Sequence, residues 1–173
     1  MEETKSIEEM RHEVIENTIR LENIFDEIIS DSLGFELEGG YDDEIPENAD
    51  NMIFRKHFLQ KLNLPQKYSL VKDITEIQMK EKLSNHFGKD FLKFIQIRNK
   101  FAHTLSPPKR DIPGMIGISI KDDERINKQI KDWIAMYLEH TKLYEKFHKE
   151  LREMFFIKIV SNGEDIYFSN RGV

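Results

Sequence analysis

The sequence has no cysteine and few residues that break helices, and both shortages limit what the protein can be. Without cysteine, disulfide frameworks, cysteine-ligated zinc, iron–sulfur clusters and thiol nucleophiles are excluded. Only 8 glycines and 5 prolines occur in 173 residues, which favours long helices over turn-rich β folds. No apolar run approaches the roughly 18 residues of a membrane helix, and the first residues lack the pattern of a signal peptide. We therefore expect a soluble, cytoplasmic and mainly α-helical protein.

Positive charge is also in short supply. The chain has 26 Lys plus Arg against 32 Asp plus Glu, a formal net charge of −6. This excludes a generally basic nucleic-acid coat protein and argues against binding to an anionic membrane surface. The length fits one domain with a substantial hydrophobic core rather than two domains.

The first part of the chain predicts one long amphipathic helix from Ser6 to about Leu33. Ser6 and Glu9 have the spacing of a capping box, and Gly34 is a natural stop for the helix. Apolar residues recur at spacings of three, four and seven. These residues are Ile7, Met10, Val14, Leu21, Ile24, Phe25, Ile28 and Ile29.

Residues 34–50 form an acidic segment that contains Gly39-Gly40 and Pro46, which predicts a long loop. Its carboxylates do not follow the alternating pattern of a calcium-binding loop, so we expect a solvated loop without a metal. His140 and His148 are eight residues apart and no tight set of ligands completes them, which argues against zinc. The sequence thus predicts no metal and no cofactor.

Several shorter helices are expected next. One covers about 51–62, a second about 66–73, and a third follows Thr75, which with Gln78 has the spacing of a cap. The first of these would bury Met52, Phe58, Leu59 and Leu62. A further helix over 89–105 has a clear apolar stripe that ends before two prolines. This stripe comprises Phe91, Phe94, Ile95, Phe101, Ala102 and Leu105.

The C-terminal third predicts a short strand over 115–120, a very long helix over 122–154 and a small hairpin. The long helix steps by threes and fours along one face. This face contains Ile126, Ile130, Trp133, Tyr137, Thr141, Tyr144, Phe147 and Leu151. Asn162-Gly163 between two apolar segments is a strong hairpin signal. We interpret 155–173 as a β-hairpin extension of the same domain.

One group of polar residues near the end of the helix over 89–105 can carry chemistry. Arg98 lies on the apolar stripe, so its charge needs a partner. Asn99 and His103 are about 40° apart on an ideal helix and can act on one object together, whereas Arg98 and His103 are about 140° apart. A purely structural reading is also open: Arg98 would pair with Asp26 or Glu27, and His103 would favour the helix dipole.

The stretch Arg98-Asn99-Lys100-Phe101-Ala102-His103 resembles the Arg-Asn-x-x-x-His motif of HEPN domains. It is also similar to a stretch of the mannitol repressor family. Both groups have helical folds, so the resemblance implies an up-and-down helical bundle over residues 1–154. The motif covers about ten residues. The acidic loop and the C-terminal hairpin are departures from the pattern.

The HEPN resemblance implies metal-independent cleavage of RNA by a dimer, with Arg98, Asn99 and His103 as catalytic residues. Histidine can transfer a proton at neutral pH, and arginine can stabilise a developing negative charge on phosphate. The resemblance also implies that Asn99 orients His103 or binds phosphate, and that the product is a 2',3'-cyclic phosphate. The flanking cations Lys100, Lys109 and Arg110 are candidates for binding RNA.

Two functions therefore stand side by side. The first is a ribonuclease in stress response or defence, such as a toxin held by an antitoxin. The second is a non-catalytic transcriptional regulator or protein-interaction module, similar to the mannitol repressors. A nuclease requires Arg98 and His103 to be open to substrate, whereas a regulator can bury them in salt bridges. The long helix over 122–154 and the split motif both predict a homodimer.

Overall fold

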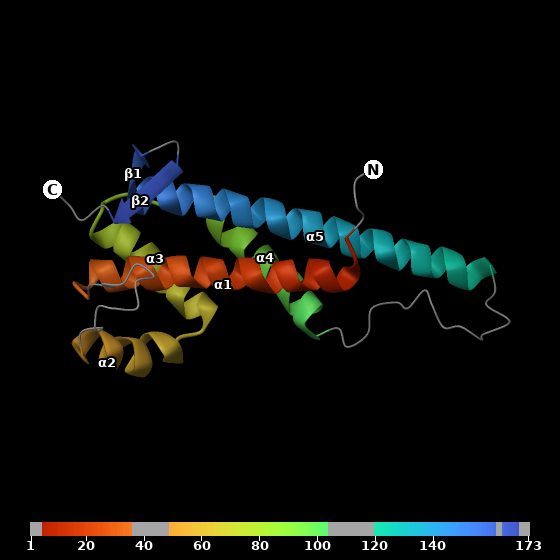
Figure 1. Ribbon diagram of the computed structural model, residues 1–173, viewed down its shortest axis with the longest axis horizontal. Helices are drawn as coiled ribbons and strands as arrows, with labels where there is room; N and C mark the ends of the chain where they lie inside the picture. The colour runs from red at the N-terminus through yellow and green to blue at the C-terminus, as the bar shows by residue number, and fades with distance from the viewer. Residues whose placement is uncertain (1–4, 36–48, 104–119, 162–163, 170–173) are drawn as a thin grey trace. The chain divides into compact units, whose positions relative to one another are not determined.

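The computed structural model describes residues 5–35, 49–103, 120–161 and 164–169, and the side chains of 5–35, 52–103 and 127–156 (Figure 1). This part of the chain is mainly α-helical, as its composition predicts. No helix within it is both long enough and apolar enough to cross a membrane. In chain order the elements are α1 (Ile7–Ser32), α2 (Ala49–His57), the 3-10 helix η1 (Leu59–Lys61), α3 (Leu64–Ile77), α4 (Phe87–His103), α5 (Ile120–Phe155), β1 (Phe156–Ser161) and β2 (Glu164–Ser169).

The chain divides into two compact units. The first unit comprises residues 1–19 and 88–146, and the second comprises 20–87 and 147–173. Helices α1 and α5 each contribute one part to each unit, because the division falls within both of them. The candidate residues of α4 belong to the first unit.

Local signals in the sequence set both ends of α1. The backbone N–H of Ser6 donates to Glu9 at 2.6 Å, and the backbone N–H of Glu9 donates to the Ser6 hydroxyl at 3.1 Å. The predicted capping box is therefore confirmed. At the other end Gly34 has a φ of 79°, and the N–H of Phe35 donates to the Ser30 carbonyl at 2.8 Å. This is a Schellman ending, which satisfies carbonyls that the helix itself leaves without partners.

Gly34→Ala is expected to destabilise the second unit by about 1 kcal/mol. A left-handed backbone conformation costs alanine roughly that much, although no atom lies within 4 Å of the added Cβ. Urea unfolding followed by circular dichroism measures the change. Gly88→Ala is the control, since Gly88 lies in the first turn of α4 and does not have the positive φ of Gly34. Equal effects of the two substitutions would contradict the assigned role of Gly34.

The first unit is built around α4, which packs on parts of α1 and α5. The ring of Phe94 stacks on His140 with centroids 4.0 Å apart, and Phe101 meets Trp133 edge-on at 4.5 Å. Two ion pairs, Lys93–Glu139 and Lys146–Asp90, also join α4 to α5. The buried residues of this unit are Met10, Val14, Thr18, Phe91, Phe94, Ile97, Phe101, Tyr137, His140 and Leu143.

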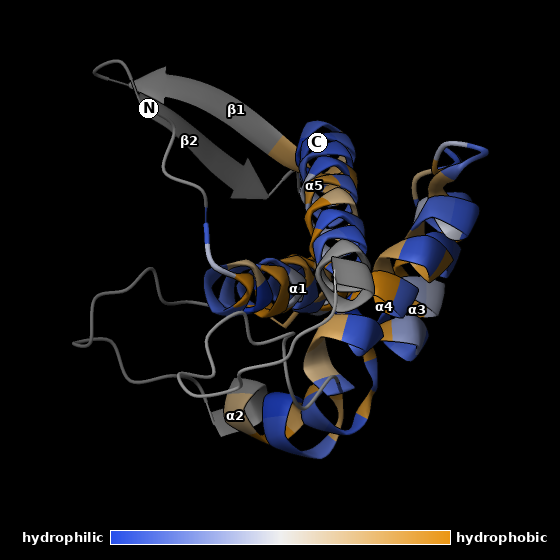
Figure 2. Cartoon of the chain, turned by 90° about the vertical axis from the view of Figure 1, so that its right-hand side faces the viewer, coloured by the Kyte–Doolittle hydropathy of each residue, from blue (hydrophilic) through white to orange (hydrophobic). Residues whose placement is uncertain are grey.

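The second unit contains α2, η1 and α3 together with the remaining parts of α1 and α5. Lys67 of α3 is buried, and its ammonium group donates to Glu22 at 2.7 Å and to Asp26 at 2.9 Å. Burial raises the pKa of the Asp26 carboxyl, against the opposing effect of Lys67. Figure 2 shows the hydrophobic and hydrophilic residues along these helices. The buried apolar residues are Leu21, Ile24, Phe25, Ile28, Ile29, Leu59, Val71, Ile74, Phe87, Phe147, Leu151, Phe155 and Phe156.

The short helices of the second unit differ most from the sequence-based expectation. Helix α2 ends at His57, and Met52 and Phe58 are 54% and 38% exposed, so the prediction that they face inward was wrong. Leu59 is buried as predicted. Phe58 instead stacks on Phe54, with ring centroids 5.1 Å apart. A 3-10 turn replaces the predicted end of the helix, which changes the direction in which side chains point.

The predicted helix after Thr75 does not form. Thr75 lies within α3, is buried, and its hydroxyl donates to the Val71 carbonyl at 2.7 Å. Residues 80–84 have no regular structure. Helix α3 is instead longer than predicted: a capping box of Asn63 and Gln66, with Pro65 in the first turn, starts it at Leu64, and it continues to Ile77.

At the C-terminal end, β1 and β2 pair antiparallel, with Phe156 opposite Ser169 and Ser161 opposite Glu164. The acidic loop lies almost entirely outside the described residues. Of the strand predicted over 115–120, only Ile120 is described, and it begins α5. The strand prediction is therefore wrong at that residue.

Candidate functional site

Helix α4 carries four of the predicted site residues, all in the first unit. Arg98 is partly buried, whereas Asn99, Lys100 and His103 are exposed. The two other candidates, Lys109 and Arg110, lie outside the described residues. The structure thus brings Arg98, Asn99 and Lys100 together in one turn, with His103 at the end of the same helix.

The Arg98 side chain begins on the buried face of α4 and ends at the surface beside Asn99. Its Nη1 donates to the Asn99 Oδ1 at 3.1 Å. Its Nε is buried and lacks a hydrogen-bond partner within the described part of the chain. In that part Arg98 also has no ion pair with a carboxylate. The amide of Asn99 therefore orients the guanidinium without neutralising its charge.

The carboxylates considered as partners for Arg98 have other cations nearby. Asp26 interacts with Lys67 at 2.8 Å, and Glu27 lies 3.8 Å from Arg152. Burial raises the pKa of the Glu27 carboxyl, and the Arg152 charge opposes this shift. Both interactions belong to the second unit, where they serve its packing.

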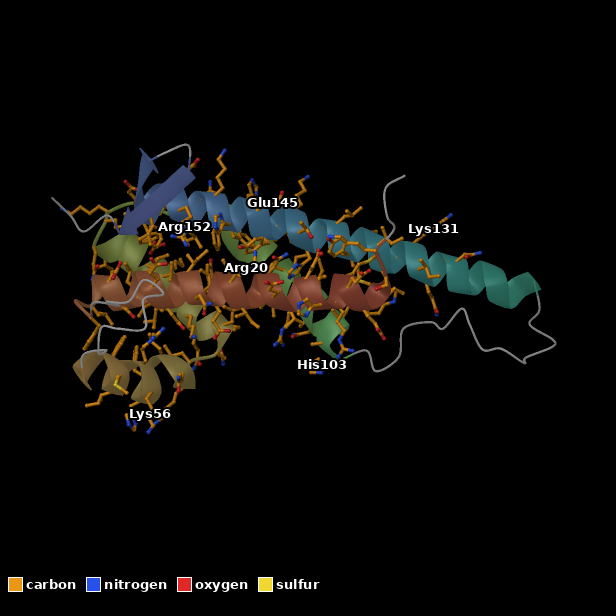
Figure 3. All side chains as sticks on the ribbon, viewed as in Figure 1. Arg20, Lys56, His103, Lys131, Glu145 and Arg152 are labelled. Atoms are coloured by element: carbon orange, nitrogen blue, oxygen red, sulfur yellow. The ribbon has the colours of Figure 1, made fainter. Side chains whose placement is uncertain are left out.

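His103 is the last residue of α4 and is exposed (Figure 3). The last carbonyls of a helix have no partner inside it, and cations are favoured there. One such carbonyl, that of Ala102, accepts a hydrogen bond of 3.1 Å from the Nη2 of Arg11 on α1. Sequence reasoning missed Arg11. No local signal could have found it, because 91 residues separate it from Ala102.

The buried side of α4 explains why these residues have defined positions. Phe94, four residues before Arg98, is fully buried against His140. Phe101, two residues before His103, is fully buried against Trp133. Packing on both sides of Arg98 holds the helix in place, so the polar residues between these anchors project from a rigid element.

His140 belongs to the core rather than to a metal site. It is fully buried, its Nε2 lies 3.5 Å from the Thr18 hydroxyl, and its Nδ1 lacks a hydrogen-bond partner within the described residues. Burial lowers the pKa of His140 to about 4, so the ring is neutral at pH 7. No group of three or more His, Asp or Glu side chains in the described ranges could hold a metal ion.

The geometry combines three chemical abilities in one short stretch. Arg98 offers a fixed charge with several N–H donors, Asn99 offers an amide, and His103 offers an imidazole open to solvent. Arg98 and Asn99 can bind a phosphate group, and His103 can transfer a proton. Comparisons with protein-family models, curated proteins and solved structures found no match.

Proposed function

We propose that this protein is a metal-independent ribonuclease of the HEPN type. The observation that carries the proposal is the state of Arg98: its guanidinium is bonded to Asn99 and, within the described residues, not to any carboxylate. A guanidinium already paired with a buried carboxylate would not be available to bind a substrate. One bonded to a neutral amide keeps its charge and can bind phosphate. The exposure of His103 on the same helix supports the proposal further.

The proposed reaction is an attack of the ribose 2'-hydroxyl on the neighbouring phosphorus. The bond from the 2'-oxygen to phosphorus forms and the bond from phosphorus to the 5'-oxygen breaks. His103 takes the proton from the 2'-hydroxyl while water protonates the leaving 5'-oxygen, or it gives a proton to the 5'-oxygen while water accepts the proton of the 2'-hydroxyl. Arg98 stabilises the negative charge that grows on the pentavalent phosphorus, and Asn99 holds the guanidinium for this role. The products are a 2',3'-cyclic phosphate and a 5'-hydroxyl.

A homodimer belongs to this proposal. Arg98 and His103 are about 140° apart on the wheel of an ideal helix. A second copy that supplies one of the two residues would bring both to a single phosphate. The proposal also includes the up-and-down HEPN arrangement of the helices, a cytoplasmic location, and an antitoxin or regulatory protein that restrains cleavage.

The experiment is incubation of the full chain with a mixed RNA substrate in chelator and without added metal. Cleavage that leaves 2',3'-cyclic phosphate ends is the expected result. Intact RNA after incubation with well-folded protein would overturn the proposal. It would favour the alternative of a non-catalytic, mannitol repressor-like regulator, which the net charge of −6 suits better because RNA binding depends on clustered cations.

A further inference from the structure

Arg11 is held against the end of α4 that carries His103. Its Nη2 donates to the Ala102 carbonyl at 3.1 Å, and its side chain is exposed. Both residues belong to the first unit. Because Ala102 directly precedes His103, this bond places a second guanidinium beside the proposed site, from an element other than α4.

The hydrogen bond to Ala102 uses only one of the N–H donors of Arg11. A guanidinium has five N–H donors, and a backbone carbonyl accepts from it without neutralising its charge. Three other cations of this unit have carboxylate partners: Lys5 pairs with Glu13, Lys93 with Glu139 and Lys146 with Asp90. Within the described residues Arg11 has no ion pair with a carboxylate. Arg11 therefore presents a positioned, uncompensated positive charge to solvent.

We propose that Arg11 binds a phosphate of the RNA strand next to the phosphate that is cut. This inference rests on the proposed function and adds the residue that holds the substrate on the end of α4. A guanidinium matches a phosphate in shape and charge and can donate two parallel hydrogen bonds to it. Contacts to phosphate carry no sequence information, so Arg11 contributes affinity and register but not base preference.

The test measures binding of a 2'-O-methyl oligoribonucleotide, which cannot be cut by the proposed reaction, over a range of salt concentrations. Arg11→Gln is the informative variant, because its amide can still donate to Ala102 while the charge is gone. The slope of log affinity against log salt is expected to become shallower by about 0.7, the value for one lost phosphate contact on a single strand. Arg11→Lys keeps the charge and is expected to retain the wild-type slope.

Lys131→Ala is the matched control. Lys131 is an exposed cation of the same unit on α5, and Figure 3 labels it on a different helix from His103. It is expected to bind the oligonucleotide as the wild type does. A loss of slope equal to that of Arg11→Gln would mean that any surface charge contributes alike, and would overturn the inference.

Cleavage of an ordinary RNA separates this inference from the proposed function. Arg11→Gln is expected to raise KM several-fold and to leave kcat unchanged, as expected for a contact that is equally strong before and during the reaction. If the wild type cleaves RNA and Arg11→Gln has the same salt slope and KM as the wild type, the role of Arg11 is overturned and the nuclease proposal is not. Binding that depends on Arg11 without any cleavage would overturn the nuclease and leave the phosphate contact standing. Absence of binding by the wild type would overturn both.

Discussion

His103→Ala is expected to slow RNA cleavage at least 100-fold while the free energy of unfolding stays close to the wild-type value. General acid–base catalysis by a positioned histidine contributes about 10²- to 10⁴-fold to a rate. His103 is exposed at the end of α4, so its removal creates no cavity and leaves no buried group without a partner. The measurement is the initial cleavage rate together with urea unfolding of the same preparation.

His86→Ala provides the control for that substitution. His86 is also exposed and lies in the turn just before α4, so the chemical change is the same at a site without a proposed catalytic role. It is expected to cleave at the wild-type rate. If His103→Ala cleaves as fast as His86→Ala, His103 has no role in proton transfer and the nuclease mechanism fails.

Arg98→Ala completes this experiment. Its folding must be measured together with its cleavage rate, because Arg98 is partly buried. Loss of cleavage in a folded Arg98→Ala variant would support the catalytic role of the guanidinium. Unfolding of the variant would instead assign Arg98 to the architecture of α4. Arg98→Lys keeps the charge but not the forked donor set, so it is expected to fold and to cleave more slowly than the wild type.

Acid is expected to destabilise the first unit through His140, by about 3 kcal/mol at pH 4 relative to pH 7. Burial lowers the pKa of His140 from 6.5 to about 4 in the folded protein. Below pH 6.5 the unfolded chain binds a proton at this residue while the folded protein does not. Each pH unit in this window therefore costs about 1.4 kcal/mol of stability. The contribution is fully present above pH 6.5 and is lost as the pH falls to 4.

His140→Gln isolates this contribution from the carboxylates that titrate in the same range. The variant lacks the titrating ring but keeps Asp26, Glu27 and His148, whose pKa values are also shifted. As the pH falls from 7 to 4, the unfolding free energy of the wild type is therefore expected to fall by more than that of the variant. Chemical unfolding at several pH values measures it. A difference that does not change with pH would show that His140 is not held neutral by burial.

The candidate site was predictable only in part. The motif from Arg98 to His103 is contiguous, so its placement on one helix follows from the apolar period of that helix. The hydrogen bond between Arg98 and Asn99 was not predicted, because the helical spacing placed Asn99 near His103 instead. The contact of Arg11 with Ala102 could not be predicted, because 91 residues separate the two and no local sequence pattern connects them.

By itself the sequence determined the features whose causes lie within a few residues. The capping box of Ser6 and Glu9, the ending at Gly34 and the length of α5 all follow from contacts or periods that the chain shows locally. The tertiary structure decided what depends on distant partners. It removed the helix predicted after Thr75, left Met52 exposed, and buried His140 beside Phe94. The physical reason is that caps and periods act over one or two turns, whereas burial depends on which helices pack together.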